Sequence, residues 1–329
     1  MIHGKKKSLL IAPYLGEFGW ELMNWQARVR RLALAGTHDR VIICAPPDRR
    51  PLYADLPQHR NVIFCPIGRM QLPGEASEDH RIDAAGRPID ADQLRSLAVG
   101  AAMESASRLG LAEPDMDILC SSHRSQLWSV HSGEQQFAEL RSHEKLTTDV
   151  LLIPRTRRLA ADRNASPDWW DDLADRLRSR RLRVNVYASP ISRAIAQLSG
   201  SRLAVGASTG GLHLASLCRC PHFVWGSGAE IRWTRLGISN RQRYETLWNP
   251  FGTPCIYDES GWQPSIEHAE QGILRALDEI GLNCSVSRPA WSLRPKWRIK
   301  RRLARLIEAV DGRTIWPWRL RQIVRERLV

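Results

Sequence analysis

The sequence predicts an α/β protein made of two doubly wound, Rossmann-like halves followed by a basic helical tail. Three observations lead to this prediction. Short runs of Val, Ile and Leu alternate with helical patterns, the alternation starts afresh at Asp149, and the positive charge is concentrated at the end of the chain. Strand followed by helix, repeated, is typical of a parallel sheet covered on both faces. We therefore expect domains at 1–147 and 148–287 and a tail at 288–329.

The first half contains four apolar runs that predict strands and two longer patterns that predict helices. Continuous apolar runs of this length indicate strands that are buried on both faces of a sheet. The strands are expected at 8–15, 40–45, 61–66 and 117–121, and the helices at 20–35 and 91–109.

The second half repeats this order after a polar stretch around residues 122–147. Strands are expected at 149–154, 182–187, 202–206 and 221–225, and helices at 168–180, at 191–199, from near Gly211 and at 265–280. The last helix carries apolar residues at helical spacing and is closed by Gly281. Trp170 is expected to pack in the core of this half rather than to contact a ligand.

The composition excludes several classes of protein. Hydrophobic residues make up 43% and charged residues 25% of the chain, as in soluble globular proteins, and no apolar run reaches the ~20 residues that span a bilayer. The apolar run behind the basic N-terminus stops at Pro13, too early for an export signal. The seven cysteines lack paired spacing, which favours reduced thiols and a cytoplasmic location. No Asp-x-Asp pair follows a strand and His and Cys do not cluster, so we expect no metal and no cofactor.

The strongest local signal is the stretch 202–216, which predicts a buried strand, a turn of small residues and a helix. Small residues let a ligand approach the backbone, and the free N–H groups of a first helical turn attract phosphate. We expect phosphate to bind there, with Ser208, Thr209, Gly210, Gly211 and His213 as the contacting residues. The alternative is a structural turn, in which Ser208 or Thr209 only caps the helix and His213 only packs.

The motif Ser-Thr-Gly-Gly-Leu-His at 208–213, followed by Leu-Ala and the apolar run 221–226, resembles a known family signature. It is similar to the Asp-Thr-Gly-Pro-Met-His signature of the lipopolysaccharide heptosyltransferases of glycosyltransferase family 9, which are GT-B enzymes. Ser208 stands where that family usually has Asp, and Gly211 where it often has Pro. The resemblance implies a glycosyltransferase that holds a nucleotide-sugar donor in a cleft between its two halves. It also implies transfer to a glycan or lipid-linked acceptor, inverting and independent of metal.

The loop after the first strand offers a candidate catalytic base. The family carries a Gly-Asp pair there, whose carboxylate is thought to deprotonate the acceptor hydroxyl; Gly16-Glu17 corresponds best by position, and Glu21 is the rival. An attacking alcohol must lose its proton, so one such base is needed. The alternative is that each Glu only compensates the positive end of a helix dipole.

Three arginines follow the first strand of the second half. Ligands of doubly wound sheets lie beyond the carboxyl ends of the strands, and Arg binds phosphate bidentately. Arg155, Arg157 and Arg158 are therefore expected to hold the leaving diphosphate, as basic and hydroxyl residues of the resembling family do in the equivalent loop. The alternative is a solvated loop. The segment 243–250 could form a further loop near the nucleotide, but its spacing is not specific.

The tail carries most of the net charge of +13. Residues 288–329 hold thirteen Lys and Arg against three acidic residues, a net charge of +10. The pattern at 298–310 predicts a basic amphipathic helix flanked by Trp, which is typical of binding to an anionic membrane surface. We expect this tail to hold the protein peripherally at the inner face of the cytoplasmic membrane, with no nucleic acid bound. Packing on the body and nucleic-acid binding are the alternatives.

Two other functions remain open at this point. One is a GT-B-fold nucleotide-sugar epimerase, which would need an acid and a base at C2. The other is a non-catalytic basic module that binds nucleic acid or an acidic polymer.

Overall fold

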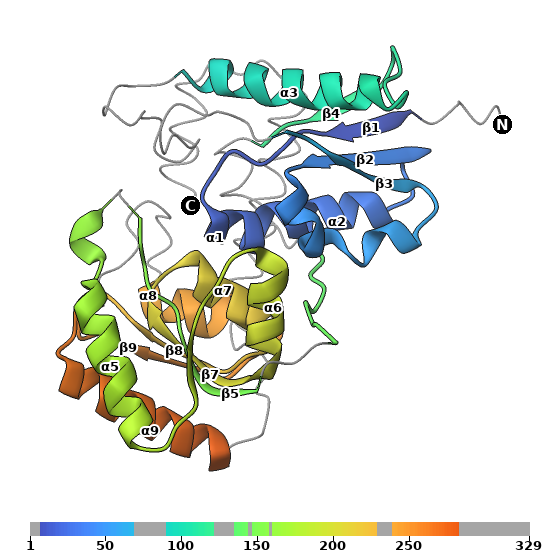
Figure 1. Cartoon of the computed structure of the whole chain (residues 1–329). Coiled ribbons are helices and arrows are strands. Elements are labelled where there is room, and N and C mark those ends of the chain that lie inside the picture. The colour runs from blue at the N-terminus through green and yellow to red at the C-terminus, as the bar shows by residue number, and fades with distance from the viewer. Residues whose placement is uncertain are drawn as a thin grey trace, which may run out of the picture. The chain divides into compact units, whose positions relative to one another are not determined.

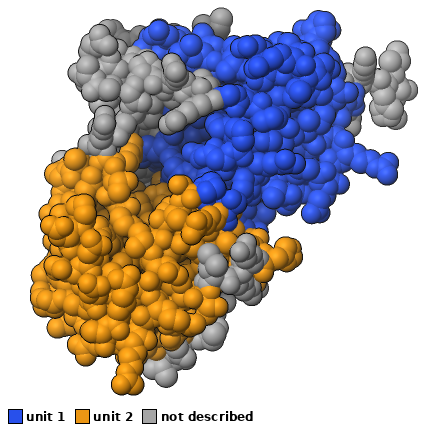
Figure 2. Space-filling view, in the orientation of Figure 1, with its two compact units in different colours: residues 1–126, 134–140, 190–192 blue, residues 127–133, 141–189, 193–329 orange. Residues whose placement is uncertain are grey.

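The chain forms two compact units, each built on one parallel sheet. The computed structural model describes residues 7–68, 90–121, 135–143, 147–157, 160–228 and 239–282. Unit 1 comprises residues 1–126, 134–140 and 190–192, and unit 2 comprises residues 127–133, 141–189 and 193–329 (Figure 2). Two parallel sheets with helices confirm the predicted α/β halves. The domain bounds at 147 and 287 and the expected cleft stay predictions, and the tail 288–329 lies outside the described residues.

The sheet of unit 1 has four parallel strands in the order β3-β2-β1-β4. The second strand has the predicted bounds, but the first ends at Ile11 rather than at residue 15. Pro13 has no N–H for the ladder, which explains this early end. The strands are β1 (Ser8–Ile11), β2 (Arg40–Ala45), β3 (Val62–Pro66) and β4 (Asp117–Leu119).

Helices cover both faces of this sheet (Figure 1). α3 (Ala91–Arg108) begins at Asp90, whose carboxylate accepts the N–H of Asp92, and its apolar side packs on β1, β2 and β3. On the other face, the helix predicted at 20–35 is three consecutive segments, α1 (Phe18–Trp20), the π-helix η1 (Glu21–Trp25) and α2 (Gln26–Leu34). Two 3₁₀ helices, η2 (Pro47–Tyr53) and η3 (Leu56–Gln58), complete the described helices of unit 1.

The sheet of unit 2 has five parallel strands in the order β6-β5-β7-β8-β9. Four of them were predicted within a few residues. The fifth was missed because its four residues lie between turn residues and make no extended apolar run. The strands are β5 (Thr148–Leu152), β6 (Val184–Val186), β7 (Ser201–Ala207), β8 (His222–Trp225) and β9 (Cys255–Asp258).

Figure 1 shows α5 (Pro167–Ser179) and α9 (Ile266–Leu282) on one face of this sheet, and α6 (Ile191–Gly200) and α7 (Gly210–Leu217) on the other. Ser166 caps α5 by accepting the N–H of Trp169, and Pro167 stands at the first turn, where its missing N–H costs nothing. Trp170 lies in the core between α5, α9 and the sheet, which confirms its predicted packing role. Three short helical segments complete the helices of unit 2 that the structure describes: η4 (Ala161–Arg163), α8 (Asn240–Gln242) and the π-helix η6 (Arg243–Leu247).

Candidate active site

The sheet of unit 2 reverses its strand order between β5 and β7. The chain leaves β5 towards β6 on one side and then returns to β7 on the other side. In open parallel sheets, ligands bind at such a switch point, beyond the carboxyl ends of the strands. The two segments predicted to bind phosphate follow these two strands: residues 153–157 after β5 and residues 208–211 after β7. The topology therefore brings them to the same edge of the sheet of unit 2.

Helix α7 begins at this switch point without a side-chain cap. Thr209 occupies the N-cap position, but its side chain makes no capping bond, and among the described residues its buried Oγ1 has no hydrogen-bond partner. Ser208 Oγ is instead a hydrogen-bond acceptor for Arg243 and Tyr244. The alternative in which Ser208 or Thr209 merely caps the helix is therefore wrong. The first N–H groups of α7 remain available to an anion.

The glycine at 211 is required by a contact across the switch point. A Cβ at Gly211 would lie 2.7 Å from Cγ2 of Ile153, the residue directly after β5. A proline would carry the same Cβ, which explains why this chain departs from the resembling signature here. Gly206 is equally confined, because a Cβ there would lie 2.6 Å from the carbonyl oxygen of Ile153. The turn thus packs closely on the end of β5.

Arg243 and Tyr244 begin the segment 243–250, which was expected as a loop near the nucleotide and which the structure starts with the π-helix η6. Nη2 of Arg243 lies 2.6 Å from Ser208 Oγ, and the Tyr244 hydroxyl lies 2.9 Å from the same atom and 3.4 Å from the carbonyl oxygen of Thr209. The guanidinium lies over the rings of Tyr244 and Trp248, at 5.2 and 5.1 Å from their centroids. Sequence alone predicts only a loop near the nucleotide at 243–250. The sole signal there was an Arg followed by aromatic residues, which often cover a guanidinium.

His213 lies in the first turns of α7 and is 4% exposed. Its ring stacks on Tyr244 and meets Trp248 edge-on, both at a centroid distance of 4.5 Å. Burial, followed by the charge of Arg243, lowers the pKa of His213 well below its ordinary value. Within the described part of the chain its Nδ1 is buried without a hydrogen-bond partner. Its predicted role in donor binding stays a prediction.

The arginine loop after β5 is organised by Arg155, which is 9% exposed. Its Nη1 donates to the carbonyl oxygen of Ala160, at 2.8 Å, and to the side-chain oxygen of Asn164. The amide of Asn164 in turn donates to the carbonyl oxygen of Arg157, at 2.7 Å. Arg155 therefore ties both ends of the loop together. Phosphate binding by Arg155 and Arg157 stays a prediction, and Arg158 lies outside the described residues.

Unit 1 has a switch point of its own, between β1 and β4. The N–H of Ala12, directly after β1, donates to the carbonyl oxygen of Leu119 at 2.8 Å. The loop that continues from β1 carries Glu17, which is half-buried and stands at the N-cap position of α1. Its carbonyl oxygen accepts the N–H groups of Trp20 and Glu21. Glu17 thus occupies the loop of unit 1 where this topology favours ligands.

Glu21 is held inside unit 1. Its side chain is 6% exposed, and Oε2 lies 2.9 Å from Nε of Arg49. The guanidinium of Arg49 also contacts the ring of Phe18, at 5.0 Å from the centroid. Burial raises the pKa of Glu21, and the charge of Arg49 opposes this rise without cancelling it. This pairing holds Glu21 in the interior of unit 1, and the choice between Glu17 and Glu21 as the base stays a prediction.

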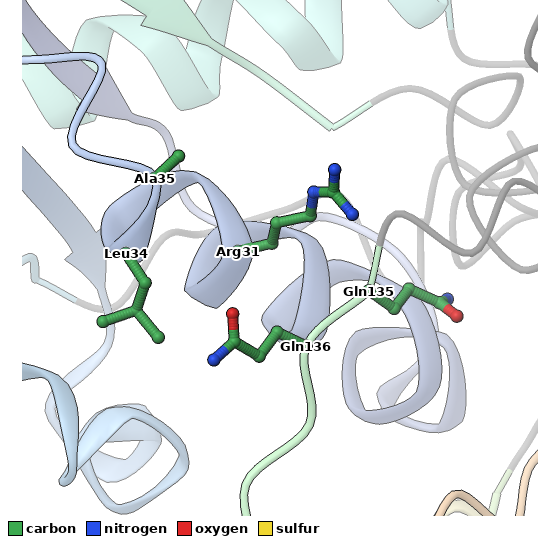
Figure 3. A pocket seen from close by; sticks show the side chains of 5 residues that line it. All are labelled: Arg31, Leu34, Ala35, Gln135 and Gln136. Carbon is green, nitrogen blue, oxygen red and sulfur yellow. The ribbon is translucent and has the colours of Figure 1, made fainter.

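A small pocket lies on unit 1 beside the end of α2 (Figure 3). It encloses about 330 Å³, and its lining carries one cation and two amide side chains. The lining residues are Arg31, Leu34, Ala35, Gln135 and Gln136. The segment 135–140 runs alongside the helix there, because the N–H of Gln136 donates to the carbonyl oxygen of Ala27. No residue predicted to bind a ligand lines this pocket.

No helix in the described ranges combines the length and apolar composition needed to cross a bilayer. The same ranges contain no group of three or more His, Cys, Asp or Glu side chains that could hold a metal ion.

Comparison with known proteins gives similarities of fold. No protein-family model and no curated protein sequence matches the chain. Among solved structures, Escherichia coli heptosyltransferase WaaC with ADP is 12% identical, with a TM-score of 0.40, over 82% of this chain and 99% of that chain. E. coli ADP-heptose lipopolysaccharide heptosyltransferase II is also 12% identical, with a TM-score of 0.42, over 83% and 99%.

A family 9 glycosyltransferase from Veillonella parvula is 10% identical, with a TM-score of 0.45, over 85% of this chain and 99% of that chain. These three matches are similarities of fold over most of the chain, at low sequence identity.

Proposed function

We propose that this protein is a glycosyltransferase that moves a sugar from a nucleotide-sugar donor to a hydroxyl group of a glycan or lipid-linked acceptor. The observation that carries the proposal is the uncapped start of α7 at the switch point of unit 2. The start of α7 receives no side-chain capping bond there, and the buried Thr209 hydroxyl has no hydrogen-bond partner among the described residues; the cation of Arg243 lies beside them. A diphosphate supplies the negative charge and the acceptor oxygens that such a site lacks.

The reaction follows from this placement of charge. The acceptor oxygen attacks C1 of the donor sugar, and the bond between C1 and the diphosphate oxygen breaks. The nucleoside diphosphate leaves with the bonding electrons, and the proton of the acceptor hydroxyl passes to a carboxylate. Attack from the side opposite the leaving group inverts the configuration at C1. Helix N–H groups and arginine stabilise the charge that develops on the leaving diphosphate, which supports a reaction independent of metal.

Glu17 is the carboxylate that we assign as base. It is half-buried in the loop after β1, at the switch point of unit 1 where this topology favours ligands, whereas the side chain of Glu21 lies in the interior of unit 1. A base must reach the hydroxyl proton of the acceptor within hydrogen-bond distance. A carboxylate already bound by a guanidinium and 6% exposed does not meet that requirement without a rearrangement.

The test begins with a thermal-shift screen of the full-length chain against nucleotide sugars that carry different bases. The donor that stabilises the protein is then used to measure release of nucleoside diphosphate. We expect Glu17→Gln to lower this rate by about 100-fold or more, with unchanged affinity for the nucleotide. The control is Glu104→Gln, which removes an exposed carboxylate of α3, and its rate should equal that of the wild type.

Three results would contradict the proposal in different ways. Stabilisation by none of the nucleotide sugars, together with retention on DNA or an acidic polymer, would favour a basic binding module. A changed sugar configuration without release of nucleoside diphosphate would favour an epimerase. If Glu17→Gln transfers sugar at the wild-type rate, the glycosyltransferase activity is supported but the assignment of Glu17 as the base is refuted.

A further inference from the structure

Arg243 is the first residue of η6 and contacts the turn that leads into α7, 35 positions earlier in the chain. Its Nη2 donates to Ser208 Oγ at 2.6 Å, and the hydroxyl of the next residue, Tyr244, lies 2.9 Å from the same oxygen. The π-helix therefore places a guanidinium beside the first free N–H groups of α7. Two distant segments of unit 2 together form the site.

The charge of Arg243 has no carboxylate to balance it in the described part of the chain. The nearby Arg241, two residues earlier, shows the contrast: it pairs with Glu245 at 3.6 Å and with Glu259 at 2.9 Å. Those carboxylates are thus already engaged. The direct contact of Arg243 in the turn is Ser208, which is neutral and stands where the resembling signature has Asp. A half-buried guanidinium without a counter-charge is costly, so an anion from outside would stabilise it.

The environment of Arg243 also leaves hydrogen-bonding groups unused. The rings of Tyr244 and Trp248 cover the guanidinium and hold its orientation. Its Nε is buried and, within the described ranges, has no hydrogen-bond partner; the same holds for Thr209 Oγ1 and for Nδ1 of His213, which is 4% exposed. Buried polar atoms in native proteins are normally bonded. Three such atoms around one helix start indicate a ligand with several charged oxygens.

We propose that Arg243 binds the diphosphate group of the ligand at the start of α7. The guanidinium donates to the phosphate oxygens from one side, and the first N–H groups of α7 donate from the other. Ser208 holds Arg243 in place without taking its charge. The inference that the ligand is a nucleoside diphosphate rests on the proposed function, whereas the diphosphate-binding role of Arg243 can be tested without a sugar or a base.

The test is calorimetric titration of the full-length chain with inorganic pyrophosphate. We expect Arg243→Gln to lower the affinity by about 10- to 100-fold, because a charge-assisted hydrogen bond is lost. The pyrophosphate affinity of Arg243→Lys should lie between those of the wild type and Arg243→Gln, since lysine keeps the charge but not the planar fork. The matched control is Arg241→Gln, which removes an exposed cation of the preceding short helix and should change the affinity by less than about twofold.

A second variant separates binding from folding. Ser208→Asp keeps Arg243 and introduces a carboxylate that bonds its guanidinium, so the folded protein should be at least as heat-stable while pyrophosphate binds at least about tenfold more weakly. Wild-type affinity in Arg243→Gln or in Ser208→Asp would overturn the proposal. A wild-type chain that does not bind pyrophosphate would also overturn it.

The failure of this inference differs from failure of the proposed function. If nucleotide-sugar transfer is observed and Arg243→Gln binds pyrophosphate normally, only the role of Arg243 is refuted. If pyrophosphate binds through Arg243 but the chain transfers no sugar, the anion site stands and the glycosyltransferase is refuted.

Discussion

Glu21 and Arg49 form an ion pair inside unit 1, with Oε2 and Nε 2.9 Å apart. The side chain of Glu21 is 6% exposed, and Arg49 is shared with the exposed Asp48 at 2.7 Å. The pair connects the first residue of η1 to η2, two segments that both precede β3 but are far apart in the sequence. It therefore orders the helical start that follows the Glu17 loop.

Removing Arg49 should lower the free energy of unfolding of the protein. Arg49→Met leaves Glu21 buried without its cation, and the free energy of unfolding is expected to fall by about 3 kcal/mol at pH 8. The pKa of Glu21 is higher in the folded chain than in the unfolded chain, because the side chain is buried. Protonation of Glu21 at low pH therefore favours the folded state. The deficit should therefore shrink as the pH falls towards 5. Urea titrations at both pH values measure it.

The matched control is Arg95→Met, which breaks an exposed pair with Asp92 on α3. Its effect should stay within about 0.5 kcal/mol. Equal stability of the two variants would show that the Glu21–Arg49 pair does not stabilise the fold.

Two glycine-to-alanine substitutions should have opposite effects. Gly211→Ala places a Cβ 2.7 Å from Cγ2 of Ile153 and should cost about 1–3 kcal/mol. Gly100→Ala lies in the exposed part of α3 with open space around it and should stabilise by about 0.5–1 kcal/mol. Adding Ile153→Ala, which removes Cγ2, should make the cost of Gly211→Ala smaller than in the wild type. Strict additivity in this double-mutant cycle would refute the contact.

Low pH should reduce the stability of the folded protein through His222 of unit 2, which is fully buried. Its Nδ1–H donates to the carbonyl oxygen of Cys220 at 3.0 Å, and burial lowers the pKa of His222 to about 4, against 6.5 for an ordinary histidine. Between these values the unfolded chain binds a proton that the folded chain does not. Stability is therefore fully present above pH 6.5 and is lost as the pH falls towards 4, by about 3 kcal/mol for this residue.

The check is the slope of unfolding free energy against pH between 7.5 and 4.5. His222→Phe cannot titrate, and its slope should be smaller than that of the wild type even if the variant is less stable overall. Part of the slope should remain, because the pKa of His213 is also lowered by burial. Identical slopes would exclude His222 as the cause.

Arg155 should matter to the stability of its loop even without a ligand. It bonds the carbonyl oxygen of Ala160, a residue in the left-handed region with a φ of 52°, and the side chain of Asn164. Arg155→Lys loses the planar fork, and the expected cost is about 1–3 kcal/mol in chemical denaturation. Arg178→Lys changes an exposed arginine paired with Asp175 and should cost less than about 0.5 kcal/mol. Equal costs would mean that Arg155 does not organise the loop.

The fold could be predicted because its signals are local. Strands buried on both faces need continuous apolar runs, and the helices between them need an apolar face, so β2 and α3 were located nearly to the residue. The turn at 208–211 was found for a similar reason, since a close backbone approach leaves room only for small residues. β9 was not predicted, because its four residues lie between turn residues and are too few to show an apolar or alternating pattern.

By itself, the sequence determined two parallel α/β halves, the strand-turn-helix segment at 202–216 and the loop that carries Glu17. Only the tertiary structure decided that Arg243 lies against Ser208, that Gly211 lies against Ile153 and that Glu21 is bound by Arg49. The reason is physical: periodicity reports which face of an element is buried, whereas contacts between distant residues depend on how whole strands and helices pack.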